Sequence, residues 1–388
     1  MLFVQTFNSV SSAGLSQFPA DRYTLGSATE EPDAILLRSH DLRETELPAS
    51  VKAIARVGAG VNNIPVEACS ERGIVVFNTP GANANSVKEL VICGMLLASR
   101  RIVEGITWAR SLATHDGDIG AEIERGKRDF TGPEIMGKTL GVVGLGAIGV
   151  AVANAGAALG MQVTGHDPFI SVTSAWGLSR SVQRAEDLET LLGASDYITI
   201  HAPLNDQTRD LIGDAQFARM KPGARLLNFA RGGLVNQPAL LRALNNGTLS
   251  SYVTDFVDAV LARHPRVLPV PHLGASTPEA EDNCAIMAVR QLMDYLEHGI
   301  VANSVNFPAV LLPPRPDTHR IQIVNRNEPN MIRQLAAVLA ESNINIANLV
   351  NKGRGALAYN VIDIGTPVNE EILARLRGID GVVRVRGL

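Results

Sequence analysis

The chain has 388 residues, of which 46% are hydrophobic and 19% charged, a composition typical of a globular protein with two or three domains. Its 35 Lys and Arg are balanced by 39 Asp and Glu, which excludes a nucleic-acid binder that relies on neutralising phosphates. The longest apolar run, near residues 90–98, is too short for a membrane span, and no basic region precedes the apolar N-terminal stretch. Three widely spaced cysteines favour reduced thiols in the cytoplasm over a disulfide or zinc framework.

Short β-type runs alternate with helical stretches over the first hundred residues, a pattern typical of a parallel α/β sheet. These runs lie at residues 3–7, 34–39, 53–57 and 74–78. From Ser86 onward apolar residues recur at helical spacing, so we expect one long helix over residues 84–104. We take this helix as a boundary between domains.

Six further β-type runs alternate with helical segments, as in one doubly wound nucleotide-binding domain. They lie at residues 139–144, 162–167, 197–202, 224–229, 252–256 and 267–271. A second long helix is expected to begin at Ser276, because Ser276 and Glu279 form a capping-box pattern. This helix would return the chain to the first domain.

Four prolines between residues 307 and 317 predict a stiff interdomain linker. The segment that follows has the order β-α-β-β-α-β, which is the ferredoxin-like arrangement. Its expected strands and helices lie at residues 320–325, 329–341, 344–352, 358–364, 369–377 and 382–385.

A glycine-rich fingerprint follows the first strand of the nucleotide-binding domain and opens a helix. Gly144 permits the tight turn, Gly146 lets a pyrophosphate approach the backbone, and Gly149 allows close packing of helix on strand. Asp167 ends the next strand, where a carboxylate accepts hydrogen bonds from ribose hydroxyls and repels a 2′-phosphate. The pattern therefore predicts NAD as the cofactor. The alternative is a simple turn followed by a solvated aspartate.

Arg231 and His272 each follow a predicted strand of the same sheet, at the edge where open α/β sheets bind ligands. An arginine can clamp a carboxylate, and a histidine can exchange a proton near neutral pH. Beside a nicotinamide, this pair is suited to interconverting a 2-hydroxy acid and a 2-oxo acid. Taken singly, Arg231 could equally form a surface ion pair and His272 a loop hydrogen bond.

The chain closely resembles the D-isomer-specific 2-hydroxyacid dehydrogenases over nearly its whole length. The motifs that carry the resemblance are Gly58-Ala59-Gly60-Val61-Asn62-Asn63, Asn78-Thr79-Pro80-Gly81, the glycine fingerprint, His201-Ala202-Pro203-Leu204, and the segments around Arg231 and His272. The resemblance implies a flavodoxin-like, discontinuous substrate domain (residues 1–95 and 285–310), a Rossmann-type NAD domain (96–284), a linker (311–318) and a C-terminal domain (319–388).

The resemblance also implies the remaining site residues. The backbone of Gly58, Ala59, Gly60 and Val61 would hold the substrate carboxylate. Arg38 would face a substrate phosphate, with Lys127 and Arg128 as weaker candidates. The rest of the cofactor pocket would come from Ala147, Ile148, His201, Phe229, Ala230, Asp255 and Gly274.

One position departs from the family. Family members pair the catalytic histidine with a glutamate a few residues beyond the aspartate that matches Asp255, and here that position falls on Ala259 or Val260. Asp258 is the nearest carboxylate in the sequence. We therefore expect Asp258 to act as the catalytic partner of His272, the alternative being an ordinary exposed side chain.

The C-terminal segment resembles an ACT domain, a regulatory module that usually pairs through its sheets. Asn327, Pro329 and Asn345 match effector-binding positions, whereas Asn325 stands where serine-inhibited relatives have a histidine. The resemblance implies a homodimer or homotetramer with L-serine or another amino acid as effector. The alternative is that these asparagines only cap strands and helices.

The resemblance therefore implies NAD-dependent oxidation of 3-phospho-D-glycerate to 3-phosphooxypyruvate, the first step of the phosphorylated pathway to L-serine. No metal, nucleic acid or membrane partner is expected. Two alternatives remain open: a glyoxylate or hydroxypyruvate reductase, and an NAD-sensing scaffold like the corepressors built on this fold.

Overall fold

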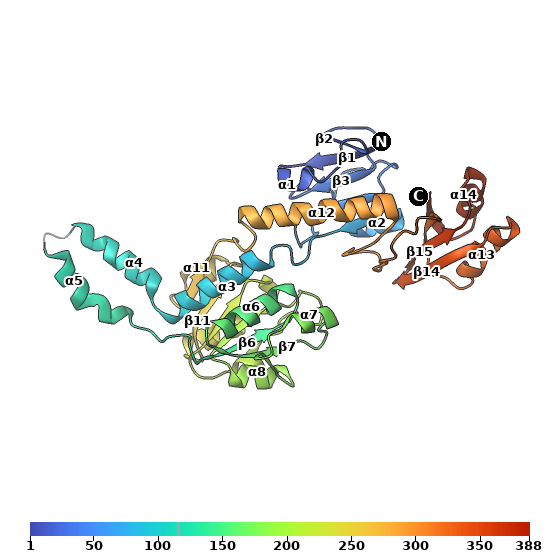
Figure 1. Cartoon of the computed structure of the whole chain (residues 1–388). Coiled ribbons are helices and arrows are strands. Elements are labelled where there is room, and N and C mark those ends of the chain that lie inside the picture. The colour runs from blue at the N-terminus through green and yellow to red at the C-terminus, as the bar shows by residue number, and fades with distance from the viewer. Residues whose placement is uncertain (115–116) are drawn as a thin grey trace. The chain divides into compact units, whose positions relative to one another are not determined.

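The computed structural model describes residues 1–114 and 117–388 and divides the chain into two compact units (Figure 1). The first unit contains residues 1–82 and 281–388, and the second contains residues 83–280. The units therefore separate before the helix α3 (Ala84–Ser99), and not near residue 95. The reason is packing, because Val87, Val91 and Met95 of α3 join a core of the second unit.

The first unit contains a five-stranded parallel sheet in the order β2-β1-β3-β4-β5, the flavodoxin-like arrangement. Its strands are β1 (Leu2–Phe7), β2 (Tyr23–Gly26), β3 (Ala34–Leu37), β4 (Ala53–Arg56) and β5 (Val75–Phe77). Helix α12 (Pro278–His298) packs Ala285, Val289 and Leu292 against one core of this unit, and α2 (Val66–Glu71) contributes Cys69 to another. The short α1 (Ser12–Leu15) follows β1. Strand β2 carries one buried residue, Tyr23, so periodicity did not reveal it.

The second unit is built on a seven-stranded parallel sheet in the order β12-β11-β10-β9-β6-β7-β8. Its strands are β6 (Thr139–Val143), β7 (Gln162–His166), β8 (Gln183–Arg184), β9 (Tyr197–Ile200), β10 (Ala224–Asn228), β11 (Leu249–Thr254) and β12 (Val267–Pro269). Chain order reverses between β6 and β9, which makes this pair the switch point of a doubly wound sheet. The Rossmann-type fold is confirmed, with two-residue β8 as a strand the sequence did not indicate.

Helices surround this sheet, and one pair extends away from it (Figure 1). The helices after α3 are α4 (Ile102–Ser111), α5 (Ile119–Gly126), α6 (Ala147–Ala158), α7 (Val172–Gly177), α8 (Leu188–Ala194), α9 (Asp214–Phe217), α10 (Gln237–Asn245) and α11 (Ala259–Arg263), with 3-10 turns η1 (Leu112–Thr114), η2 (Lys127–Phe130) and η3 (Gly232–Leu234). The single helix expected over residues 84–104 is wrong. Arg100 adopts an extended backbone, so α3 and α4 are separate.

The C-terminal segment forms a four-stranded antiparallel sheet in the order β14-β15-β13-β16, with its two helices packed on one face. Its elements are β13 (His319–Arg326), α13 (Met331–Glu341), β14 (Ile346–Arg354), β15 (Leu357–Ile364), α14 (Glu370–Arg377) and β16 (Val382–Gly387). The ferredoxin-like arrangement is confirmed. None of the helices in the described part of the chain is long and apolar enough to cross a membrane.

Candidate functional site

The glycine-rich turn between β6 and α6 has the geometry that a dinucleotide site needs. Gly144 has a φ of +90°, and a Cβ there would lie 2.7 Å from the carbonyl oxygen of His201. A Cβ on Gly149 would collide with the carbonyl oxygen of Gly144. A Cβ on Gly146, by contrast, would meet nothing within 4 Å. The turn is therefore closed on the protein side and open where a pyrophosphate would approach.

The amino end of α6 offers donors to that open side. Gly146 is its N-cap residue and has no side chain that could satisfy the first amides, while Ala147 and Ile148 form the first turn. Free amides and the positive end of the helix dipole attract an anion. This arrangement fits the pyrophosphate of NAD.

Asp167 follows β7 and is bonded to the glycine turn. One carboxylate oxygen accepts from the Leu145 amide at 2.8 Å, and the other accepts from the Phe169 amide at 2.8 Å. A carboxylate oxygen can accept more than one hydrogen bond. The carboxylate is therefore held in place and keeps acceptor capacity for ribose hydroxyls.

His201 follows β9, next to the switch point of the sheet. Its Nε2 lies 3.0 Å from the Thr199 hydroxyl, and burial lowers its pKa to about 4. The imidazole is therefore neutral at physiological pH and adds no positive charge beside the glycine turn.

Arg231 stands in the turn after β10, and a residue that the sequence reasoning missed holds that turn. The fully buried Asn228 donates from Nδ2 to the Arg231 carbonyl at 2.8 Å and accepts from the Ala230 amide at 3.1 Å. The Arg231 guanidinium itself is exposed and donates to the Ala230 carbonyl at 2.6 Å. Phe229 is buried in the core below. The sequence signal that could have identified Asn228 is an asparagine at the last position of a largely apolar strand, because a buried polar side chain must find hydrogen-bond partners.

His272 is paired with Asp255. The Nδ1 atom of His272 lies 3.2 Å from Oδ2 of Asp255, whose side chain is 1% exposed, while the imidazole is 67% exposed. Phe256 contacts the imidazole edge-on, with ring centroids 5.2 Å apart. Burial raises the pKa of Asp255, and the nearby charges of His272 and Arg231 oppose that rise. These residues follow adjacent strands β10, β11 and β12, so the sheet gathers them at one edge.

The assignment of Asp258 as the partner of His272 is corrected by this geometry. Asp258 is the N-cap of α11, where its Oδ1 accepts from the amides of Val260 and Leu261 at 3.0 and 2.8 Å. Its Oδ2 accepts from Gln237 at 2.8 Å. Both oxygens are thus already bonded, Oδ1 to the first turn of α11 and Oδ2 to Gln237. Asp255 contacts His272 because it directly follows β11, on the strand next to β12.

Asp255 also has an oxygen available for a ligand. Its Oδ1 is buried and has no hydrogen-bond partner among the described residues. An unpaired buried carboxylate oxygen is costly unless a ligand satisfies it.

The loop after β4 in the first unit contains the predicted carboxylate-binding amides. Gly58 has a φ of +137°, and its amide already donates to the Thr79 hydroxyl at 2.8 Å. The guanidinium of Arg56, a residue that sequence reasoning did not single out, lies where a Cβ on Gly58 would be. The loop is therefore held by Thr79 and carries positive charge.

Arg38 follows β3 in the same unit and is bound to an acidic residue of α12. Its Nη2 lies 2.7 Å from Oε1 of Glu281, and both side chains are partly exposed. Its carbonyl accepts from Nε of Arg56 at 3.1 Å, which links the two arginines through the backbone. The weaker candidates belong to the second unit, where Lys127 and Arg128 are part of η2, which continues from α5, and Lys127 pairs with Glu124.

The predicted effector residues lie in the C-terminal segment, but Asn325 is turned inward. It is fully buried, its Oδ1 accepts from Asn360 at 2.5 Å and its Nδ2 donates to the Arg326 carbonyl. Asn327 and Asn345 are exposed. Asn325 therefore serves the sheet, and only the other two side chains face solvent.

No group of three His, Cys, Asp or Glu side chains that could hold a metal ion occurs in the described ranges 1–114 and 117–388.

Comparison with known proteins agrees with this geometry. Residues 92–274 match the family described as D-isomer specific 2-hydroxyacid dehydrogenase, NAD binding domain. The chain is 32% identical over 381 residues to a D-3-phosphoglycerate dehydrogenase of Haemophilus influenzae, covering 94% of this chain and 88% of that protein.

Two solved structures are similar in fold. One is a glyoxylate reductase from Paecilomyes thermophila, with a TM-score of 0.64 and 26% identity over 78% of this chain and 98% of that one. The other is an NAD+-bound 3-phosphoglycerate dehydrogenase from Entamoeba histolytica, with a TM-score of 0.61 and 24% identity over 80% and 99%. The chain belongs to the D-isomer specific 2-hydroxyacid dehydrogenase family.

Proposed function

We propose that the chain catalyses the NAD-dependent oxidation of 3-phospho-D-glycerate to 3-phosphooxypyruvate, which opens the phosphorylated pathway to L-serine. The observation that carries this proposal is the gathering of Arg231 and the Asp255–His272 pair at the edge of the sheet that also holds the glycine turn. The D-3-phosphoglycerate dehydrogenase of Haemophilus influenzae, aligned over 94% of the chain, supports the substrate.

The chain's own residues perform the proton and charge chemistry. Arg231 donates to the substrate carboxylate and polarises the adjacent carbonyl group. Asp255 accepts from Nδ1 of His272, which leaves Nε2 as the base that takes the hydroxyl proton. NAD, when bound, supplies the hydride acceptor. We assign the unpaired Oδ1 of Asp255 to the amide of the nicotinamide.

The first unit supplies the groups that suit a phosphorylated acid. We assign the substrate carboxylate to the amides of Ala59, Gly60 and Val61, since the Gly58 amide is already bonded to Thr79. Arg38 is the phosphate ligand, and it must exchange Glu281 for the substrate. An exposed ion pair contributes little stability, so this exchange costs about 1 kcal/mol or less.

The discriminating experiment measures NADH absorbance with 3-phosphoglycerate, D-glycerate and D-lactate, and in the reverse direction with glyoxylate and hydroxypyruvate. We expect kcat/KM for 3-phosphoglycerate to exceed that for D-glycerate by at least about tenfold, because only the former engages Arg38. Preference for glyoxylate would instead identify the reductase, a reading favoured by the similarity to the Paecilomyes thermophila enzyme. NAD binding without turnover of any substrate would identify the sensing scaffold.

We further propose that the protein is a homo-oligomer and that it lies in the cytoplasm. Its widely spaced free cysteines support the cytoplasmic location. Helices α4 and α5 form an arm that extends from the second unit (Figure 1), and neither of the two helices contains a buried residue. Ile102, Val103 and Ile106 of α4 and Ile119 and Ile123 of α5 are 36–48% exposed. Isolated helices of this length are marginal in water, so the arm needs an apolar partner surface, which a second copy provides.

The C-terminal module (residues 319–388) is proposed to be an ACT-type regulatory domain. Its ferredoxin-like sheet supports this, but the buried Asn325 leaves Asn327 and Asn345 as the residues that could meet an effector. Calorimetric titration with L-serine tests the proposal. Absence of both binding and inhibition at about millimolar L-serine would exclude serine as the effector. A dissociation constant of about 1 mM corresponds to a binding free energy of roughly 4 kcal/mol.

A further inference from the structure

The face of the C-terminal sheet that α13 and α14 leave uncovered packs on the rest of the first unit. Val324, Tyr359 and Val361 from this face share one hydrophobic core with Leu296 of α12 and with Phe307. Such continuity of the core is unlike a domain tethered only by a linker. The C-terminal module is therefore a packed part of the first unit.

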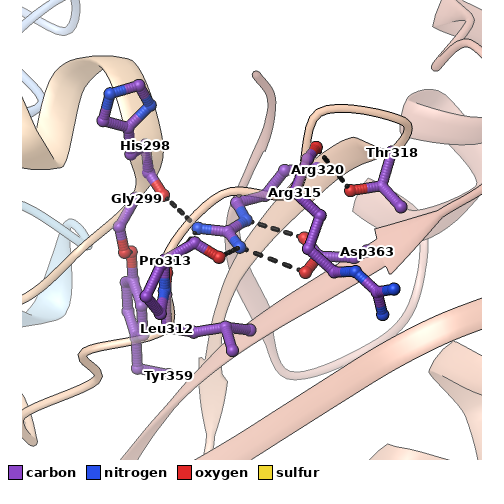
Figure 2. Close-up of polar contacts among 9 residues, drawn as sticks. All are labelled: His298, Gly299, Leu312, Pro313, Arg315, Thr318, Arg320, Tyr359 and Asp363. Carbon is purple, nitrogen blue, oxygen red and sulfur yellow. Dashed lines mark hydrogen bonds and ion pairs between the residues drawn. The ribbon is translucent and has the colours of Figure 1, made fainter.

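Arg320 of β13 joins the module to the rest of the first unit and uses all five of its donors (Figure 2). Nε and Nη2 donate to the two carboxylate oxygens of Asp363 at 2.7 and 3.1 Å. The remaining donors reach the carbonyls of His298, Leu312 and Pro313 at 2.7, 2.8 and 3.0 Å. Arg320 is 5% exposed and Asp363 0%. A buried guanidinium with every proton bonded in this way is held in one geometry.

These bonds reach the carboxyl end of α12, where a helix leaves unpaired carbonyls. The His298 carbonyl accepts from Arg320, the Gly299 carbonyl accepts from the Tyr359 hydroxyl at 2.6 Å, and the Leu296 carbonyl accepts from Arg386 at 2.7 Å. Two of these donors are cationic, which also suits the negative end of the helix dipole. The C-terminal module therefore caps α12.

The opposite part of α12 is tied to the loops that follow β1, β3 and β5. Glu281 binds Arg38, and Asp282 accepts from the Ser11 hydroxyl. Further along, Gln291 donates to the Asn78 carbonyl at 3.0 Å. Glu281 and His298 lie about 25 Å apart along a continuous helix. A displacement at the capped end is transmitted to the Arg38 end because a helix moves as a rod.

We propose that Arg320 is a positioning residue that clamps the C-terminal module to the carboxyl end of α12 and thereby fixes the Glu281–Arg38 pair at the other end. The segment expected to be a stiff interdomain linker, residues 311–318, is part of this clamp, since two of its carbonyls are bonded to Arg320. The effect on substrate rests on the proposed function, whereas the clamp itself does not.

The clamp is tested by limited proteolysis of the full chain with subtilisin. In Arg320→Met, and in the double variant Arg320→Met/Asp363→Leu, we expect cleavage within residues 311–318 to become at least about tenfold faster, because the carbonyl bonds are lost. The double variant leaves no unpaired buried charge, so its thermal midpoint should stay nearer that of the wild type than the single variant's. Arg242→Met, which breaks the exposed Arg242–Asp214 pair, is the matched control and should leave cleavage unchanged.

The positioning role is tested by steady-state kinetics on the same proteins. We expect KM for 3-phosphoglycerate to rise at least about fivefold in the double variant, with kcat and KM for NAD unchanged, because only the Arg38 end of the site is affected. An unchanged cleavage rate in the double variant would overturn the clamp, and an unchanged KM would overturn the positioning of Arg38. If the wild type itself oxidises no 3-phosphoglycerate, the proposed function fails while proteolysis still reports on the clamp.

Discussion

Asp255 determines which nitrogen of His272 can act as the base, because its carboxylate is paired with Nδ1. A carboxylate on Nδ1 fixes the tautomer that leaves Nε2 basic, and the exposed imidazole has freedom to rotate without it. Ala259 and Val260 stand where the family resemblance leads one to expect a glutamate, so His272 depends on Asp255, which directly follows β11.

Asp255→Asn should lower kcat by about 100-fold, because an amide can hold His272 in the wrong tautomer. The matched control is Asp258→Asn, which keeps a capping oxygen for α11 and should leave the melting temperature nearly unchanged and kcat within about twofold. Stopped-flow and steady-state rates of NADH formation measure both. A kcat loss in Asp258→Asn equal to that in Asp255→Asn would restore the original assignment of Asp258.

His201 makes the stability of the second unit depend on pH. Its pKa is about 4 in the folded state and 6.5 as a free side chain, so the unfolded chain binds a proton first as the pH falls. The contribution to stability is complete above pH 6.5 and is lost as the pH falls towards 4.

We therefore expect the free energy of unfolding from urea titrations to decrease between pH 6.5 and 4, and this decrease to be smaller in His201→Gln. His264→Gln replaces a half-buried imidazole of the same unit and serves as the control. Equal pH dependence in wild type and His201→Gln would show that His201 does not contribute.

At the scale of elements, two glycines of the turn have different roles, because Gly146 borders open space and Gly149 packs against the backbone. Gly146→Ala places a methyl group in open space, where a pyrophosphate would lie, so stability should be kept and NAD affinity should fall about 10- to 100-fold. Gly149→Ala drives a methyl group into the Gly144 carbonyl and should destabilise the fold by about 1–3 kcal/mol. Calorimetry with and without NAD measures both quantities. The opposite pattern would mean that the open side of the turn is not the cofactor side.

For the whole molecule, we expect two copies of the chain to associate through the arm formed by α4 and α5. Ile106→Glu places a charge among the exposed apolar residues of the arm and should convert the oligomer to smaller species. Val172→Glu changes a residue that is 75% exposed on α7, outside the arm, and should leave the oligomer intact. Sedimentation velocity at matched concentration measures the outcome. A monomeric wild type, or an intact Ile106→Glu oligomer, would contradict the proposed role of the arm.

Much of the architecture follows from local patterns. Alternating strands and helices with the glycine fingerprint predicted the doubly wound sheet, and the β-α-β-β-α-β order predicted the C-terminal fold. Helix ends were predicted less well, because hydrophobic periodicity does not report the backbone conformation that ends a helix. Arg100 ends α3 inside an apolar periodicity, and Thr277, rather than Ser276, caps α12 by accepting from the Ala280 amide, since Pro278 occupies the first helical position.

The sequence by itself determined the kind of site, because glycines after a strand and an Arg and His at strand ends are constrained by backbone geometry and by side-chain chemistry at short range. Only the tertiary structure decided which carboxylate serves His272, that Asn325 is buried, and that Arg320 joins the C-terminal module to α12. These outcomes depend on which distant segments meet in the packed core, where a buried polar group must find a partner. Sequence spacing does not encode that choice.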